Sequence, residues 1–227
     1  MRLVLLSLLS IVVAVSLTAS VAAQGPPFVD DFENYDAGDN AGSVWEEVYS
    51  YEDEFSSGGA EVVEDGSQVL EVSRAYLWHN TMNRLFAGKM KVVESSDDFD
   101  WYGSRLSLVN QDNPLERYEV RLYPNTNKFQ VNYVDRTGRT GIMSQDELIT
   151  TSEILDSSEC NIEADKWYYV LIMKNGPDKW KAMLFSWNRP TCHVEWQDDR
   201  IETNRPAIGI QSAGKFVTTN FDEIFAI

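Results

Sequence analysis

The 227-residue chain is predicted to fold as an all-β protein, a two-sheet antiparallel β-sandwich, and three observations predict this class. Apolar residues alternate with polar ones over short stretches, which is the two-residue period of a half-buried strand. Turn signals rich in glycine, asparagine and proline separate these stretches, and no long segment shows the 3.6-residue period of a helix. Short strands at this spacing are typical of two antiparallel sheets packed face to face.

The first 23 residues are predicted to be a signal peptide. A positive charge at Arg2 precedes an almost unbroken apolar run over residues 3–17, and Val21 and Ala23 are the small residues that signal peptidase requires. This run of about 15 residues is short for a transmembrane helix, although an uncleaved N-terminal anchor is the alternative. We therefore expect an exported protein that is secreted, periplasmic or at the cell surface. It should consist of one domain over residues 24–227, with no membrane insertion after signal removal.

The strand candidates share the alternating pattern and are bounded by turn signals such as Asp65-Gly66 and Asn175-Gly176. They are residues 68–74, 85–94, 105–110, 117–123, 128–134, Trp167–Lys174, 180–187, 206–211 and 219–227. Residues 28–38 form a further candidate, and in a closed sandwich the first and last strands often lie side by side. The polar and acidic stretch 144–163 is predicted to be a long loop that has room for one helical turn.

Short motifs at both ends of the domain carry a family resemblance. The opening FVDDFENYDAG at residues 28–38 and the closing NFDEIFAI at residues 220–227 resemble the concanavalin A-like lectin/glucanase superfamily, in particular its laminin-G-like jelly rolls. The segments VEDGSQVLEVS, DKWYYVLIMKNG and RPAIGIQSAG also follow that pattern. The resemblance spans nearly all of the chain after the signal peptide, and it implies a concanavalin A-like jelly roll.

The resemblance also implies a cofactor. In this superfamily a structural calcium ion often ties the first strand to the last, and calcium takes six to eight oxygen ligands. The matching positions are Glu33 and Asp222, followed by Asp31 and Asp30. The alternative is that these acids are exposed or cap turns.

The two cysteines, Cys160 and Cys192, are predicted to form a disulfide. They lie symmetrically about the Asn175-Gly176 turn, so pairing of the flanking strands would bring the sulfurs together near the open end of that hairpin. In an oxidising compartment the bond would close a loop of about 30 residues and stabilise the fold by about 3 kcal/mol. The alternative is a free catalytic thiol beside His193.

A ligand site is predicted on the polar face of two neighbouring strands. In residues 117–123 and 128–134, apolar side chains alternate with long hydrogen-bonding ones, and a third strand at 105–110 extends the polar stripe. Such side chains, held on rigid strands, suit sugar hydroxyls and uronate carboxylates. The alternative is a solvated outer face with cross-strand Arg–Glu pairs. The candidate ligand-binding residues are Arg105, Arg117, Glu119, Arg121, Gln130 and Asn132.

Tryptophans add a second set of candidates, because an indole face can stack on a sugar ring. Four of the seven lie in or beside turn-rich segments, namely Trp45, Trp78, Trp101 and Trp196. Among them Trp78 and Trp101 are the better candidates, since Asn80 and Tyr102 are polar neighbours. The remaining three, Trp167, Trp180 and Trp187, lie on the late hairpin and are expected to pack in the core or against the sheet.

Two known catalytic patterns of related jelly rolls are incomplete here. Glucanases of the superfamily carry paired carboxylates as Glu-x-Asp-x-(x)-Glu on one strand, and no predicted strand has that spacing. Residues 117–121 are similar to the Arg-x-Glu-x-Arg strand of alginate lyases. The Gln-x-His motif of those enzymes would fall at residues 130–132, but its histidine is Asn132 here and the two motifs lie too close together in sequence. Whether the chain is an enzyme is left open, with a non-catalytic protein favoured.

Charge narrows the range of partners. There are 36 Asp and Glu residues against 19 Lys and Arg, a net charge of −17. Such a chain repels nucleic acid and anionic lipid, although the charge could serve solubility alone. We expect a carbohydrate-binding or cell-surface interaction module with a polysaccharide or other glycan as partner. The alternatives are a divergent polysaccharide-degrading enzyme and a structural envelope protein.

Overall fold

The computed structural model describes residues 27–50, 58–81, 83–93, 103–138, 151–187, 189–201, 206–213 and 217–227. The predicted signal peptide over residues 1–23 and the candidate Trp101 lie outside the described residues. Within these ranges no helix is long and apolar enough to cross a membrane. One short 3-10 helix, η1 (Pro124–Thr126), joins two of the strands.

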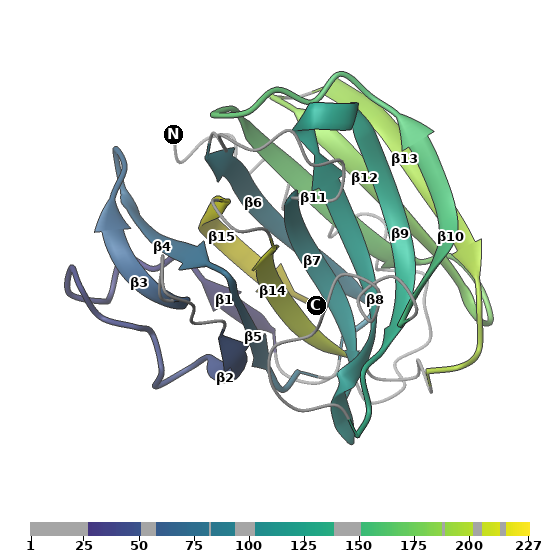
Figure 1. Ribbon diagram of the computed structural model, residues 1–227, viewed down its shortest axis with the longest axis horizontal. Coiled ribbons are helices and arrows are strands. Elements are labelled where there is room, and N and C mark those ends of the chain that lie inside the picture. Colours follow the sequence, from purple (N-terminus) through teal and green to yellow (C-terminus); the bar gives the residue numbers. More distant parts are fainter. Residues whose placement is uncertain are drawn as a thin grey trace.

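Two antiparallel sheets face each other, as Figure 1 shows. The first sheet has the strand order β13 (Arg189–Gln197), β12 (Lys179–Ser186), β11 (Trp167–Lys174), β6 (Leu85–Val93), β15 (Thr218–Ala226), β4 (Gln68–Ser73) and β3 (Gly59–Glu64), and β1 (Phe28–Asp30) pairs with β15. The second has the order β10 (Ser152–Glu159), β9 (Lys128–Asp135), β8 (Asn113–Tyr123), β7 (Gly103–Asn110), β14 (Ala207–Ala213), β5 (Ala75–His79) and β2 (Glu46–Ser50). The predicted all-β, two-sheet sandwich is confirmed.

The core lies between the sheets and is built from alternate residues of the strands. Tyr118, Val120 and Leu122 of β8 are fully buried there, together with Phe129 and Val131 of β9. These are the side chains whose alternation predicted an inner face. Because successive residues of a strand point to opposite faces, the polar residues between them lie on the outer face of the second sheet.

The first and last strands pair as expected, but β1 is much shorter than the predicted strand over residues 28–38. Its end is fixed by the carboxylate of Asp30, which accepts hydrogen bonds from the Phe32 backbone N–H at 3.1 Å, the Tyr35 hydroxyl at 3.0 Å and the Trp45 indole N–H at 2.9 Å. Phe32 then takes a left-handed conformation with φ 57°. The opening motif is therefore a strand of three residues followed by a turn that Asp30 ties together.

The prediction of a loop over residues 144–163 is wrong for residues 152–159, which form the edge strand β10, and its first part, residues 144–150, lies outside the described residues. This strand pairs with β9 and contains a register shift between Ile154 and Asp156. Most of its side chains are exposed or half-buried, so it lacks the apolar alternation that marks a strand in sequence. The edge strand β13 was missed for a similar reason, since only Val194 and Trp196 are buried along it.

The predicted disulfide is confirmed, with the Cα atoms of Cys160 and Cys192 6.0 Å apart. Its position differs from the expected open end of the β11–β12 hairpin. Cys160 directly follows β10, the edge of the second sheet, and Cys192 lies in β13, the edge of the first. These two strands run side by side in Figure 1, so the bond joins the two sheets at their shared edge.

The burial of the tryptophans differs from the prediction at several positions. Trp45 and Trp196 are buried, at 2% and 6% exposure, and have no free face for a sugar, while Trp180 packs in the core as predicted. The expected packing of Trp187 is wrong, because this residue is 83% exposed at the β12–β13 turn with a left-handed φ of 52°. The turn presents it to solvent instead of folding it onto the sheet.

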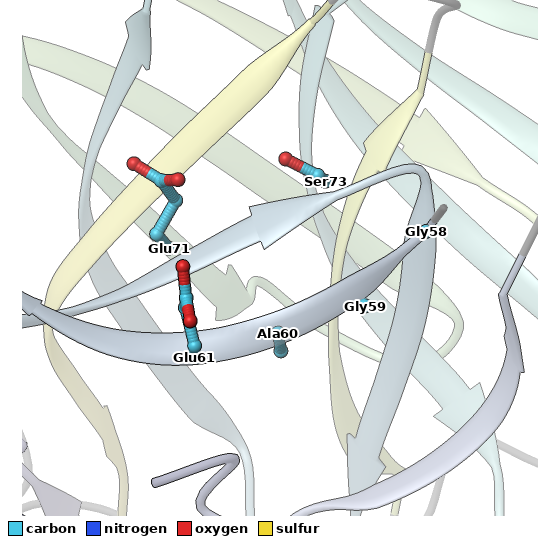
Figure 2. Close-up of a pocket in the computed structure, with 6 residues that line it drawn as sticks. All are labelled: Gly58, Gly59, Ala60, Glu61, Glu71 and Ser73. Carbon is cyan, nitrogen blue, oxygen red and sulfur yellow. The ribbon is translucent and has the colours of Figure 1, made fainter. Parts of the chain in front are cut away.

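A shallow pocket of about 280 Å³ lies on the β3–β4 hairpin (Figure 2). Two of its described lining residues, Glu61 and Glu71, are directly paired across the two strands. Burial and the neighbouring charge of Glu61 raise the pKa of Glu71. None of the lining residues in the described part of the chain is aromatic or cationic, so these residues offer a sugar no ring to stack on and no positive charge.

Candidate functional site

The structure brings six predicted residues together on the outer face of the second sheet. Across the strands, Arg105 pairs with Arg121, which pairs in turn with Gln130; Glu119 pairs with Asn132 in the next row. Alternation along β8 adds Arg117 to the same face. We call this surface the arginine face, and it consists of Arg105, Arg117, Glu119, Arg121, Gln130 and Asn132.

The arginine face is not the solvated surface that was considered as an alternative. Arg117 and Glu119 are 0% exposed, and Arg105 is 4% exposed. Arg121 and Gln130, at 7% each, keep the largest exposed fractions of the six. Ion pairs buried to this degree are screened by salt much less than surface pairs are. Their effect on stability depends on their geometry and on whether their mutual attraction offsets the cost of removing the charges from water.

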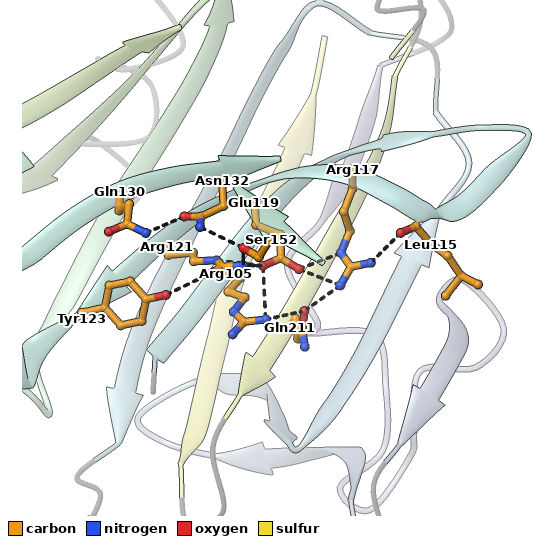
Figure 3. Close-up of polar contacts among 10 residues, drawn as sticks. All are labelled: Arg105, Leu115, Arg117, Glu119, Arg121, Tyr123, Gln130, Asn132, Ser152 and Gln211. Carbon is orange, nitrogen blue, oxygen red and sulfur yellow. Dashed lines mark hydrogen bonds and ion pairs between the residues drawn. The ribbon is translucent and has the colours of Figure 1, made fainter. Parts of the chain in front are cut away.

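Glu119 is the centre of a buried ion cluster (Figure 3). Its Oε1 atom accepts from Arg117 Nε at 2.8 Å and lies 2.6 Å from Arg117 Nη2. Its Oε2 atom accepts from Arg121 Nε at 2.8 Å and lies 2.7 Å from Arg121 Nη2. Arg105 Nη1 lies 3.1 Å from the same Oε2 atom, so three guanidinium groups share one carboxylate.

These contacts decide the charge state of Glu119. Burial alone would raise its pKa, but the positive charges of Arg105, Arg121 and Arg117 outweigh burial and hold the pKa well below its usual range. The carboxylate therefore remains ionised at physiological pH. It is suited to orienting the arginines and is poorly suited to giving up a proton as a general acid.

A chain of polar contacts extends the cluster toward β10. Arg121 donates from Nη1 to the Tyr123 hydroxyl at 3.0 Å and from Nη2 to the Ser152 hydroxyl at 3.0 Å. Asn132 Nδ2 donates to the same Ser152 oxygen at 2.9 Å, and Gln130 Nε2 donates to Asn132 Oδ1 at 2.6 Å. The edge strand β10, which the sequence did not indicate, thus supplies one partner of the site.

Sequence reasoning also missed the aromatic side of the site. The ring of Tyr76 lies over Gly209, where an added Cβ would be 2.8 Å from Tyr76 Cε2 and 2.9 Å from Val109 Cγ2. Since glycine leaves this space open, the ring can reach Arg117, whose guanidinium carbon lies 4.2 Å from the ring centroid. A glycine between two isoleucines in a strand was the available signal for such a close approach.

Gln211 was likewise missed, although it lies two residues after Gly209 on β14. Its Oε1 atom accepts from Arg105 Nη1 at 3.2 Å and from Arg117 Nη2 at 3.4 Å. The contacts join β14 to the cluster on β7 and β8. Its place in the site depends on the pairing of β14 with β7, which no local pattern reveals.

Trp78 lies at one side of the arginine face. It pairs with Gly209, which pairs with Ser107, so these three residues form one row across β5, β14 and β7. The indole nitrogen of Trp78 is buried and has no hydrogen-bond partner within the described ranges. The same is true of the Ser107 hydroxyl and of Arg105 Nε.

The predicted calcium positions are not brought together as a cage. Asp222 forms an ion pair with Lys89 on the neighbouring strand β6. Asp31 and Glu33 are exposed beyond the end of β1, and the Asp30 carboxylate is occupied by the three hydrogen bonds of the turn. Over the described part of the chain, no group of three or more His, Cys, Asp or Glu side chains is placed to hold a metal ion.

Comparison with known proteins identifies the fold. No protein-family model matches the chain, and no curated protein matches it in sequence. Solved structures do match, among them SCLam, a non-specific endo-beta-1,3(4)-glucanase from family GH16, with a TM-score of 0.56, 9% identity, and coverage of 91% of this chain and 92% of that one. The protein has the concanavalin A-like jelly-roll fold.

Two further matching structures are not named as glucanases. The carbohydrate binding module CBM66 from Bacillus subtilis matches with a TM-score of 0.51 and 10% identity over 81% of this chain and 95% of that one. The exoplasmic/lumenal domain of VIP36 in a Ca2+/Man3GlcNAc-bound form matches with a TM-score of 0.51 and 10% identity, covering 81% and 83%. Identities this low establish the jelly roll and leave its activity to be argued from the site.

Proposed function

We propose that this jelly roll is an exported, non-catalytic carbohydrate-binding module that holds a polysaccharide on its arginine face. The observation that supports this most strongly is the gathering of guanidinium and amide groups beside Trp78 on one rigid sheet. Guanidinium and amide groups donate directional hydrogen bonds to saccharide oxygens, and an indole offers an apolar face. The polysaccharide meets the face first at Arg121 and Gln130, its most exposed members.

The chemistry of the face favours binding over catalysis. Glycosidases use two carboxyl groups, one of which acts as a proton donor. Glu119 is held ionised between three arginines, which leaves it unsuited to that role. A lyase needs a base, and the segment that resembles the Gln-x-His motif of alginate lyases has an amide, Asn132, in place of the histidine.

Export is part of the same proposal. The apolar segment and small residues of the first 23 positions favour a secretory signal. The Cys160–Cys192 disulfide supports an oxidising destination such as the periplasm, the cell surface or the medium. A net charge of −17 makes nucleic acid an unfavourable partner.

We expect the mature protein to be retained by at least one member of a polysaccharide panel without releasing products. Retention and products are measured together, by binding to immobilised polymer and by assays for reducing ends and unsaturated uronates. Arg121→Ala should weaken binding by about 1–3 kcal/mol, because it removes a charged hydrogen-bond donor. Arg189→Ala, on the exposed edge strand β13, is the matched control and should leave affinity unchanged.

The other outcomes of the panel identify the rival functions. New reducing ends or unsaturated uronates would establish a polysaccharide-degrading enzyme. This rival function is considered because one structural neighbour is a glucanase of family GH16. Absence of both retention and products would favour a structural envelope protein. Unchanged affinity in Arg121→Ala, with the variant shown to be folded by circular dichroism, would move the site away from the arginine face.

A structural calcium ion between the terminal strands stays a separate prediction, supported by the Ca2+-bound form of VIP36. In this chain the ion would have to displace Lys89 from Asp222 and draw further oxygens from Asp31 and Glu33. The expected result is a melting temperature that rises with calcium and falls with chelator, a difference that Asp222→Ala abolishes. A melting temperature of the wild type that changes with neither calcium nor chelator would contradict the predicted calcium site.

A further inference from the structure

Among the described residues, the arginine face carries more positive than negative charge. Both oxygens of the Glu119 carboxylate are shared among the guanidinium groups of Arg105, Arg117 and Arg121. These four residues contribute three positive charges and one negative charge, all from buried side chains. A buried cluster of this composition is stabilised by a partner that brings negative charge.

Three buried donor groups lie close to this cluster without an acceptor in the described structure. They are Arg105 Nε, the Ser107 hydroxyl and the Trp78 indole N–H. Arg105 and Ser107 are two residues apart on β7 and therefore share a face, and Ser107 and Trp78 belong to one row across the sheet. Buried donors are nearly always paired in native proteins, so the absence of partners indicates a missing acceptor.

Arg105 and Arg121, which share Oε2 of Glu119, differ in how far nearby groups offset the effect of burial on their pKa values. Burial lowers the pKa of Arg105 despite the nearby charge of Glu119. For Arg121 burial acts in the same direction, but the contacts with Tyr123 and Glu119 outweigh it and raise the pKa. The less compensated cation is therefore the one whose Nε lacks an acceptor.

We propose that the polysaccharide held on the arginine face is acidic, and that its carboxylate or sulfate oxygens accept the hydrogen bonds offered by Arg105, Ser107 and Trp78. This rests on the proposed carbohydrate-binding function and names the class of glycan. An acidic group supplies both missing elements, acceptor oxygens and negative charge. The net charge of −17 repels polyanions at long range, so specific contacts on this face account for their retention.

The test is isothermal titration of the mature protein with three probes at physiological salt: polygalacturonate, the same polymer with its carboxyl groups reduced to alcohols, and a sulfated galactan. We expect at least one of the two acidic polymers to bind about 10-fold or more tightly than the carboxyl-reduced polymer, as expected for a charged hydrogen bond gained. Which acidic polymer binds distinguishes a carboxylate from a sulfate ester. Equal or tighter binding of the reduced polymer would overturn the acidic class while leaving carbohydrate binding in place.

Variants test whether the preference for the acidic polymer depends on the unpartnered donor groups. Arg105→Gln should remove the preference for the acidic polymer, whereas Arg189→Gln, an exposed arginine on β13, should keep it. If Arg105→Gln does not fold, Ser107→Ala removes a single donor with little change of shape. It should weaken binding of the acidic polymer severalfold more than binding of the reduced one, and an equal effect on both polymers, or none on either, would overturn the assignment. Failure to bind any saccharide would instead overturn the proposed function itself.

Discussion

Glu119→Gln is expected to lower the free energy of unfolding by about 3–5 kcal/mol, the usual effect of removing one partner from a buried ion cluster. Glutamine matches glutamate in shape but carries no charge, so the guanidinium groups of Arg105, Arg117 and Arg121 would face one another without their shared carboxylate. Urea unfolding followed by tryptophan fluorescence measures the change. The exposed Glu195, paired with Lys181, is the matched control, and Glu195→Gln should leave the unfolding midpoint unchanged.

The pH dependence of this difference follows from the low pKa of Glu119 in the folded protein. A carboxylate whose pKa is lowered by folding contributes its full stabilisation above the pKa of the unfolded chain, about 4.3 for glutamate. The difference between wild type and Glu119→Gln should therefore be complete at neutral pH and shrink as the pH falls below about 4 toward the folded-state pKa. A difference below about 1 kcal/mol at neutral pH would show that the cluster does not hold the arginines in place.

Replacing both Cys160 and Cys192 by serine is expected to lower the free energy of unfolding by about 3 kcal/mol in the chain-entropy model. The bond spans 32 residues and fastens β10 to β13, so its loss frees two edge strands that belong to different sheets. Urea unfolding with and without a reductant measures the effect. The reductant should destabilise the wild type and leave the serine double variant unchanged.

Thiol labelling of the native protein gives an independent check of the disulfide. Neither cysteine should react before reduction, because both sulfurs are in the bond. Reaction of two thiols in the untreated folded protein would contradict the bond, and an unfolding curve insensitive to reductant would contradict its contribution to stability.

Alternation of residue types predicted much of this fold because it reports which side of a strand is buried. Tyr118, Val120 and Leu122 alternate with Arg117, Glu119 and Arg121, and the two sets lie on opposite faces as expected. The pairing of the terminal strands was also predictable, because the motifs at both ends resemble a known jelly roll. Where one face of a strand packs in the core, its pattern is preserved in the sequence.

Features fixed by tertiary contacts were not predictable in the same way. The side chains of β10 are exposed or half-buried, so its residues carry no apolar alternation, yet its Ser152 bonds to Arg121 and Asn132. Alternation placed the arginines on one face but contained no information on their burial. The contributions of Tyr76 and Gln211 depend on the neighbours of β14, which only the assembled sheet defines.

The most direct test of carbohydrate binding on the arginine face is nuclear magnetic resonance of the labelled protein during titration with an oligosaccharide from the polymer that it retains. The side-chain N–H signals of Arg105, Arg121 and Trp78 report on this face and can be resolved from backbone signals. We predict that these signals, with backbone amides of β7, β8 and β9, show the largest shifts. Shifts confined to the β3–β4 pocket or to the exposed Trp187, with the arginine signals unmoved, would contradict binding at this face.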